Sequence, residues 1–305
     1  MCYNRSMRFI LMGTGTSHGI PVIGCDCKVC TSADPHDNRM RCSAYVVQDK
    51  TEVVIDVGPE FRLQALRNHI RHLDAVLLTH SHADHLHGLD DLRIFSHTHP
   101  CHYDRAAFPE TAGKGLPVYG NKGTLSDVRK RFSYIFKPVK EGGGVAKLDF
   151  TDCSAYSKDS PLVLGGLRIV PVPLMHGSIE ATGWLFSCDG SDGKRRSIAY
   201  LTDCSAVPED SVALVKNAGG LLEHLVIDGL RVRPHSTHFS FDEALACGEK
   251  IGARHTWFIH MNHDLLHTEI QSYIDERLQD YPLLENIVKS GGSVSPAYDQ
   301  LELTA

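Results

Sequence analysis

The sequence has no uninterrupted apolar run long enough to cross a bilayer, so we expect no membrane span. It also lacks a signal-peptide pattern, because residues 1–7 (MCYNRSM) contain no apolar region and the strand-like RFILM that follows is too short. Together these absences predict a cytoplasmic protein. The chain shows no internal repeat and no shift of composition, so we expect one domain over residues 1–305.

An excess of positive charge is also missing. The 31 Lys and Arg are outnumbered by 37 Asp and Glu, which gives a net charge of −6, so the surface as a whole does not attract a phosphate polymer. We therefore expect no stable nucleic-acid partner, although a local basic groove is compatible with this total. A small-molecule substrate is expected instead, and a homodimer is compatible with the sequence.

Cysteine and histidine are plentiful. Ten Cys without a secretion signal indicate thiols or metal ligands rather than a disulfide framework. The 19 His are informative through their placement in a few tight groups, because imidazole is the commonest protein ligand for zinc-like metals. Six isolated cysteines are expected to pack as small hydrophobic residues: Cys2, Cys42, Cys153, Cys188, Cys204 and Cys247.

Short β-rich runs alternate with helical patterns, which predicts a layered α/β fold. The expected strands are Arg8–Met12, Ala44–Val47, Glu52–Val57, Ala75–Thr79, Arg168–Val172, Gly183–Ser187, Ile198–Thr202, Leu225–Asp228 and Thr256–His260. The expected helices are Glu60–Asn68, Leu86–Phe95, Lys122–Phe132, Glu209–Ala218, Phe241–Ile251 and Thr268–Gln279. The segment from about Lys137 to Gly166 is the least regular and is interpreted as an inserted surface loop or hairpin.

The strongest chemical pattern is His80-Ser81-His82-Ala83-Asp84-His85, between an apolar strand and a helical segment. Four ligand-type side chains on such a strand-to-helix turn can point into one cavity and hold a dication. The alternative is a solvated His-rich loop, which would not need a strand before it and a helix after it. One hexapeptide cannot complete two coordination spheres. Three later residues at or near strand ends are candidates for the remaining positions: His176, Asp203 and His260.

A second metal-type pattern is Cys25-Asp26-Cys27-Lys28-Val29-Cys30, which gives three thiolates within six residues. Thiolates select zinc in tetrahedral structural sites, and His263, three residues beyond His260, is the candidate fourth ligand. A redox-active or simply buried group of cysteines is the alternative, because C-x-C-x-x-C is a looser pattern than paired C-x-x-C motifs.

The HSHADH motif, the later His176, Asp203 at a strand end and His260 near the C-terminus resemble the metallo-β-lactamase superfamily over nearly the whole chain. The resemblance implies a four-layer αββα sandwich with the metals at one edge of its two sheets. It implies one metal held by His80, His82 and His176, a second held by Asp84, His85 and His260, and Asp203 bridging both.

With the Cys25, Cys27, Cys30 and His263 set and the opening GTGTSHG, the pattern is similar to the PhnP-like phosphoribosyl cyclic phosphodiesterases. That likeness implies two Zn²⁺ or Mn²⁺ in the active site, one structural Zn²⁺ and a cyclic phosphate ester of ribose or a nucleoside as substrate. A metal-activated hydroxide would attack phosphorus, with Asp84 and Asp203 among the catalytic residues.

The Pro234–His238 loop resembles the loop that places a histidine beside the substrate phosphate in that family, with His238 a better match than His235. We expect His238 to protonate the leaving alkoxide. Asp56 is expected to orient a metal-bound imidazole. His97, His99 and His102 are interpreted as rim or lid residues.

Three other functions are compatible with the same ligands. An RNA-processing endonuclease like the tRNA 3′-processing enzymes would need a basic arm, for which Lys137, Lys140 and Lys147 are the candidates. A thioesterase related to glyoxalase II would use the metals on a different ester. A nucleotide-binding sensor without turnover is less favoured, because loss of catalysis would relax the need for all seven ligand positions.

Overall fold

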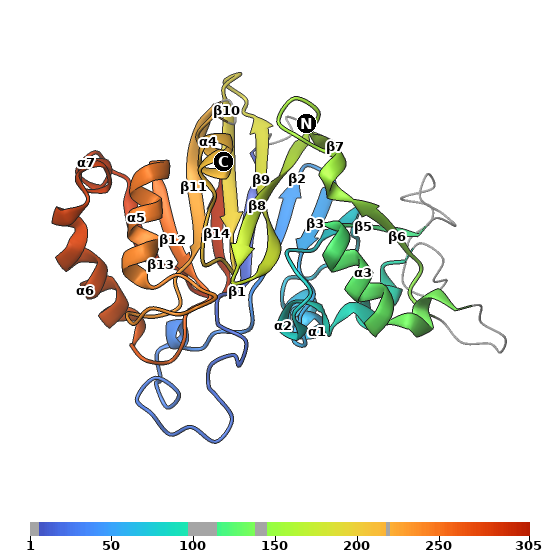
Figure 1. The fold of residues 1–305 in the computed structure, drawn as a ribbon, viewed down its shortest axis with the longest axis horizontal. Coiled ribbons are helices and arrows are strands. Elements are labelled where there is room, and N and C mark those ends of the chain that lie inside the picture. The colour runs from blue at the N-terminus through green and yellow to red at the C-terminus, as the bar shows by residue number, and fades with distance from the viewer. Residues whose placement is uncertain (1–5, 97–114, 138–144, 218–219) are drawn as a thin grey trace.

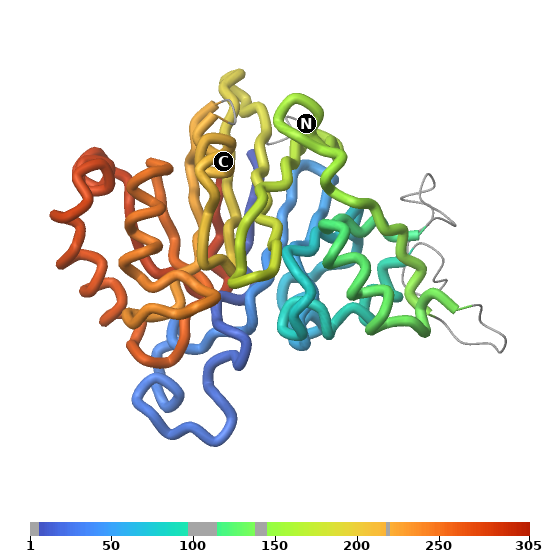
Figure 2. The backbone as a smooth tube through the Cα atoms, viewed as in Figure 1, coloured from blue at the N-terminus to red at the C-terminus, as the bar shows by residue number. Residues whose placement is uncertain are grey.

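The computed structural model describes residues 6–96, 115–137, 145–217 and 220–305 of the 305-residue chain. In this part of the chain two seven-stranded sheets pack face to face, and helices cover both outer faces. Figure 1 shows α1 to α3 beside one sheet and α4 to α7 beside the other, and the tube in Figure 2 follows the same layers. The predicted four-layer αββα sandwich is confirmed.

The first sheet has the strand order β14-β1-β2-β3-β4-β5-β6. Its strands are β1 (Arg8–Gly13), β2 (Ser43–Gln48), β3 (Thr51–Ile55), β4 (Ala75–Leu77), β5 (Leu116–Gly120), β6 (Leu148–Asp152) and β14 (Leu301–Thr304). From β3 to β6 neighbouring strands run parallel, so their carboxyl ends reach the same edge of the sheet.

The second sheet has the order β13-β12-β11-β10-β9-β8-β7. Its strands are β7 (Leu162–Leu164), β8 (Leu167–His176), β9 (Ile179–Asp189), β10 (Arg195–Leu201), β11 (Leu221–Asp228), β12 (His255–Ile259) and β13 (Ser293–Pro296). Strands β10 to β13 run parallel, so Asp203, Asp228 and His260 follow or end strands at one edge.

The helices are α1 (Phe61–Arg67), α2 (Ala83–Leu86), α3 (Lys122–Arg131), α4 (Glu209–Lys216), α5 (Phe241–Ile251), α6 (His267–Arg277) and α7 (Pro282–Lys289). The central core lies between the sheets, where Phe9 packs edge-on against Phe186 and beside Tyr200. Separate apolar clusters join each sheet to its helices. Strand residues therefore alternate between the two kinds of core, and burial on both faces explains their long apolar runs.

Two local predictions were wrong. The expected helix Leu86–Phe95 is divided into α2 and a 3₁₀ helix, Leu89–Ile94, because Gly88 packs so closely that an added Cβ would collide with the carbonyl oxygen of Gly58. The described residues of the segment 137–166 contain β6 and β7, which are edge strands of the two sheets rather than only a surface loop. Such short, half-exposed strands carry little periodic signal.

The prediction about His97, His99 and His102 falls outside the described residues, as does Lys140 of the proposed basic arm. Within the described ranges, every helix is too short or too polar to traverse a bilayer.

Candidate metal centre

The HSHADH motif occupies the turn from β4 into α2 at the shared edge of the two sheets. Its His80 and His82 lie against His176, the last residue of β8, and the ligand atoms of the three imidazoles are all within 4.8 Å of one another. His82 Nδ1 is 3.2 Å from His176 Nε2. Three ring nitrogens that face one point from two sheets form a compact ligand group.

A second group consists of Asp84, His85, Asp203 and His260, and all four residues are buried. Asp203 Oδ2 lies 3.3 Å from His85 Nε2 and 3.2 Å from His260 Nε2. The same oxygen is 3.8 Å from His80 Nε2, which belongs to the first group. Asp203 thus touches both groups, as a residue in the bridging position must.

Backbone strain accompanies this geometry. Asp203 and His260 follow their strands with φ of 54° and 63°, and Asp56 has φ of 57° at the end of β3. Non-glycine residues rarely adopt the left-handed region, and such outliers gather at functional sites where the surrounding fold holds them. Here each left-handed residue turns a polar side chain back between the sheets.

Two partners fix the imidazole rings. Asp56 Oδ2 accepts hydrogen bonds from Thr79 Oγ1 at 2.7 Å and from His85 Nδ1 at 2.7 Å, so the Nε2 of His85 is left facing the two aspartates. His176 Nδ1 donates to the backbone oxygen of Thr237 at 2.7 Å, which leaves its Nε2 beside His82. Carboxylate and carbonyl partners of this kind orient metal-bound imidazoles.

The carboxylates of the cluster are held in their charged form. Burial would raise the pKa of Asp84, but the neighbouring His85 and His260 outweigh burial and lower it. Burial likewise opposes ionisation of Asp203, and His260 and His85 lower its pKa well below the usual value. Two buried anions require nearby positive charge, because an unpaired charge in the interior costs several kcal/mol or more.

The residues fit divalent metals. The Nε2 atoms of His80, His85 and His260 are buried and have no hydrogen-bond partner among the described residues. Buried polar nitrogens are rarely left without a partner, so their lone pairs are available for a cation. Imidazole and carboxylate together suit zinc and manganese.

His238 lies at the edge of this cluster, with its ring stacked on His260 at 4.3 Å between centroids and 4.7 Å from the ring of His176. Its Nδ1 is 2.7 Å from Asp228 Oδ2, an oxygen that also accepts the Cys204 amide, so His238 donates from Nδ1, and its Nε2 makes no hydrogen bond to any residue that the structure describes. Burial lowers the pKa of His238.

The ring of His235 contacts that of His238 at 5.4 Å, and its Nδ1 accepts hydrogen bonds from Thr237. Of the two histidines, His238 is thus the one that touches the metal-type residues.

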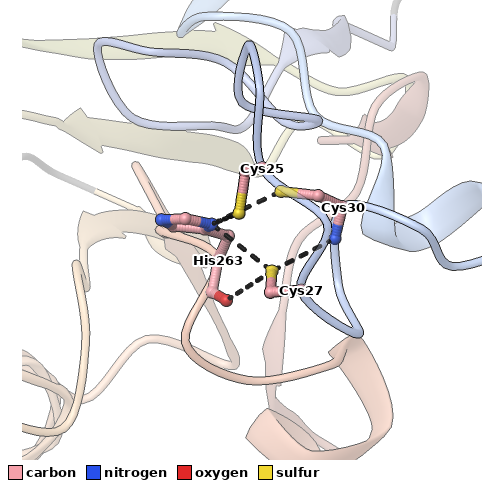
Figure 3. A group of neighbouring side chains, drawn as sticks. All are labelled: Cys25, Cys27, Cys30 and His263. Atoms are coloured by element: carbon pink, nitrogen blue, oxygen red, sulfur yellow. Dashed lines mark hydrogen bonds between the residues drawn. The ribbon is translucent and has the colours of Figure 1, made fainter.

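Cys25, Cys27 and Cys30, on the loop between β1 and β2, form a separate group with His263. The sulfur atoms of Cys25 and Cys27 are each 3.5 Å from His263 Nδ1, and that of Cys30 is 3.3 Å from it (Figure 3). Figure 3 shows the three sulfur atoms and the imidazole facing a common centre. His260 therefore belongs to the group of Asp84, His85 and Asp203, and His263 belongs to the cysteine group, although both lie on one short loop.

Contacts with the helical side of the second sheet help to fasten the loop between β1 and β2 to the body of the protein. Lys28 pairs with Glu269 on α6 at 2.6 Å. The buried Arg39 donates to the backbone oxygen of Asn262, and Asp37 accepts the amide of His267. The loop between β1 and β2 projects beyond the sheets in Figure 1 but is anchored at its base.

Comparison with known proteins agrees with this geometry. A model of the beta-lactamase superfamily domain matches residues 51–261, which contain HSHADH, His176, Asp203 and His260. The chain belongs to the metallo-β-lactamase superfamily. It shares the hydrolase fold of that superfamily, whose members bind divalent metals.

Two solved structures of the superfamily illustrate the likeness. A new diphosphatase from the PhnP family is 34% identical, covers 98% of this chain and 97% of its own, and has a TM-score of 0.75. Zn²⁺-bound PqqB from Methylobacterium extorquens is 19% identical, covers 97% and 99%, has a TM-score of 0.69, and is similar in fold.

Among curated proteins, an octanoyltransferase of Porphyromonas gingivalis is 34% identical over 291 residues, which is 94% of this chain. The match covers 52% of that protein, so the present chain spans about half the length of this relative. The activity of the whole octanoyltransferase therefore cannot be assigned from similarity alone to this chain, a member of the metallo-β-lactamase superfamily.

The sequence patterns missed several supporting residues of the metallo-β-lactamase site. Asp228 orients His238, Thr79 bonds to Asp56, and Ser81 Oγ donates to Asp127 on α3 at 2.9 Å. Asp228 could have been found, because it ends an apolar strand in the same way as the other edge residues. Thr79 and Asp127 lack any such signal, since their partners are distant in sequence.

Proposed function

We propose that this chain is a dinuclear metal-dependent phosphodiesterase of the PhnP type that hydrolyses a small cyclic phosphate ester of ribose or a nucleoside. The observation that carries the proposal is the position of Asp203, whose Oδ2 lies within 3.8 Å of imidazole nitrogens from both ligand groups. A carboxylate shared by two groups suits a pair of cations rather than one.

In this proposal His80, His82 and His176 hold one Zn²⁺ or Mn²⁺, Asp84, His85 and His260 hold the other, and Asp203 joins them. When bound, two such cations supply Lewis acidity that lowers the pKa of water and offsets the charge of a phosphate. The protein keeps both carboxylates ionised and, through Asp56 and the backbone oxygen of Thr237, turns the rings of His85 and His176 so that their Nε2 atoms face the cluster. Preorganisation of this kind lowers the reorganisation needed in the transition state.

His238 is proposed to protonate the leaving alkoxide from Nε2. Asp228 holds the ring through Nδ1, and the stacked ring of His260 places it beside the metal-type residues. Opening a cyclic ester breaks one P–O bond, adds the elements of water and leaves a phosphomonoester in one piece, so a single proton donor at that oxygen suffices.

The Cys25, Cys27, Cys30 and His263 group is proposed to hold one structural Zn²⁺. Four soft or borderline donors leave no open position, which is the arrangement of structural rather than catalytic zinc. Because His263 lies on the loop that carries His260, a zinc ion in this group would also steady one side of the active site.

A diphosphate is the second candidate substrate. The 34% identical neighbour that matches the chain over nearly its full length is a diphosphatase of the PhnP family. A phosphoanhydride and a phosphodiester place the same kind of charge on the attacked phosphorus, so one metal centre could act on either.

Other activities find less support. The octanoyltransferase relative is about twice as long as the matched region, and the described cluster is one of metal-type ligands. Human tRNase Z shares the fold at 15% identity, but the net charge of −6 does not favour an RNA polymer. We propose a small-molecule substrate and a cytoplasmic location.

The test is a screen of the metal-loaded protein against cyclic phosphates of ribose and nucleosides, linear diesters and nucleoside diphosphates, with Asp203→Asn as the inactive control. Turnover of a cyclic ester that the control loses by about 10³-fold or more is the expected result. Hydrolysis of a thioester with no action on any phosphate would overturn the proposal, and a shift of a tRNA precursor with its cleavage would favour the endonuclease.

A further inference from the structure

A second cavity lies beside the metal centre but is built from different residues. Its volume is about 720 Å³, and its lining comes from the loop between β1 and β2, from α1 and from the turn between β13 and β14. Pockets of this size hold nucleotide-sized ligands. None of the residues in the two His/Asp groups lines it.

The cavity has a cationic side. Arg41, Arg67 and His18 line it together with the buried Arg39. Arg67, at the end of α1, makes no hydrogen bond or salt bridge within the described ranges. Burial raises the pKa of Asp299 and the charge of Arg67 acts to lower it, so an anion that entered here would meet a guanidinium that has a nearby carboxylate but no direct ion pair.

The acidic groups of the lining are already engaged. Glu60 forms an ion pair with Arg41 through Nη1, and Arg41 Nε donates to the backbone oxygen of Ser17, so Nη2 is the guanidinium nitrogen of Arg41 without a hydrogen bond in the described ranges. Asp299 accepts hydrogen bonds from the backbone and side chain of Thr14 and from the amide of Met40. Burial raises the pKa of Asp299 to about 6, which weakens its negative field further in mildly acid solution.

Another part of the lining is aromatic and apolar. The rings of His36 and Tyr298 are 4.3 Å apart, and His267 packs behind His36 at 4.8 Å. Pro21 and Pro35 continue this side of the lining. A flat ring can stack on such a surface, since every nucleobase offers a π-face.

One glycine separates the cavity from the metal centre. A Cβ added at Gly58 would collide with the backbone oxygen of Asp84 and would lie 3.9 Å from the Cβ of Arg41. Arg41, a lining residue, is therefore a close neighbour of the turn that carries Asp84.

We propose that this cavity binds a mononucleotide, with its phosphate at Arg41 and Arg67 and its base against His36 and Tyr298. Two sources share this chemistry: the part of a nucleotide substrate remote from the attacked phosphorus, or a separate nucleotide that modulates the enzyme. The binding itself does not depend on the proposed function, and only the substrate source rests on it.

Binding is tested with AMP by titration calorimetry on the full chain, with adenosine and ribose 5-phosphate as fragments that lack one half of the ligand. AMP should bind at least about tenfold more tightly than either fragment, because both sides of the cavity contribute. Arg67→Glu and His36→Ala should each weaken AMP binding about tenfold. Arg62→Glu is the matched control, since Arg62 is on the same helix but lines a different cavity.

His80→Ala separates this cavity from the metal centre, and this variant should still bind AMP. Absence of saturable AMP binding to the wild-type protein would overturn the proposal. So would binding that His80→Ala abolishes and Arg67→Glu leaves intact, because AMP would then sit on the metal-type residues.

Kinetics then distinguish the two sources. For a substrate subsite, Arg67→Glu should raise KM for nucleotide substrates about tenfold and leave KM for bis-p-nitrophenyl phosphate unchanged. For a separate nucleotide, AMP should alter the rate on bis-p-nitrophenyl phosphate in wild type but not in Arg67→Glu. Retained AMP binding with no turnover of any phosphate ester would count against the proposed function and not against this cavity.

Discussion

The two metal-type groups of this protein share one loop but differ in chemistry. The His/Asp cluster is buried and contains two carboxylates, and the Nε2 atoms of His80, His85 and His260 face Asp203 without a hydrogen bond among the described residues. The cysteine group is half-buried, contains three thiols and one imidazole, and lies on a projecting loop. His260 and His263 belong to different groups although only two residues separate them.

This difference separates an open site from a closed one. In the proposed assignment four donors would complete the tetrahedral shell that zinc prefers, which would leave the cysteine group no position for a substrate. The His/Asp cluster spreads seven donors over two groups, and His238 stands beside them with a free nitrogen. We therefore expect substitutions in the His/Asp cluster to abolish catalysis, and substitutions in the cysteine group to reduce stability.

The largest effect is expected from Asp203→Ala. Because Asp203 touches both ligand groups, its loss should lower kcat/KM on the best phosphodiester by about 10³-fold or more and reduce the active-site metal content. Steady-state kinetics and elemental analysis measure the two effects. Asp210→Ala, an exposed acid in the first turn of α4, is the control and should keep both values. Full activity of Asp203→Ala would show that Asp203 is not a ligand shared by the two groups.

His238→Ala should keep the active-site metals yet lower kcat by about 10²- to 10⁴-fold on substrates with poor leaving groups. The loss should shrink on p-nitrophenyl esters, whose leaving group needs no proton. His235→Ala is the matched control, because its ring reaches only His238 in this cluster. Wild-type rates on every diester would exclude His238 as the proton donor.

Cys27→Ser should release about one equivalent of zinc and lower stability by about 2 kcal/mol, which is a fall in Tm of about 3 °C for a chain of this length, since a structural site contributes directly to folding. The active-site metals should remain. Cys247→Ala, which alters a buried thiol on α5, should leave the zinc content unchanged. An unaltered metal stoichiometry in Cys27→Ser would refute the structural site.

An imidazole outside both groups provides the last comparison. His224 accepts a hydrogen bond from Trp257 Nε1 at 3.1 Å and donates to the oxygen of Thr304 at 3.1 Å, so protein partners occupy both its nitrogens. Burial lowers the pKa of His224 to about 4. Between pH 6.5 and 4 the imidazole of His224 is protonated in the unfolded chain but not in the folded protein. The free energy of unfolding should therefore decrease as the pH is lowered from 6.5 to 4, by up to about 3 kcal/mol.

His224→Gln keeps a donor and an acceptor but cannot titrate. Its free energy of unfolding, measured by urea denaturation at several pH values, should fall less steeply than that of wild type between pH 6.5 and 4. An identical slope in the two proteins would show that His224 is not the group responsible.

The sequence predicted the layered α/β fold and its central strands because those strands are buried on both faces and therefore strongly apolar. It also predicted HSHADH at the end of a strand, because a run of ligand-type residues there has few other uses. The edge strands β6 and β7 and the interruption at Gly88 were missed, since they depend on pairing and close packing with distant residues.

By itself, the sequence determined the kinds of donor available and their order along the chain. Only the tertiary structure decided which donors face one another: that Asp203 lies between two imidazole groups, that Asp228 rather than a nearer acid holds His238, and that His263 turns away from His260 toward the cysteines. The reason is geometric, because these residues meet only where strands of two sheets end at one edge, and residue order does not encode that distance.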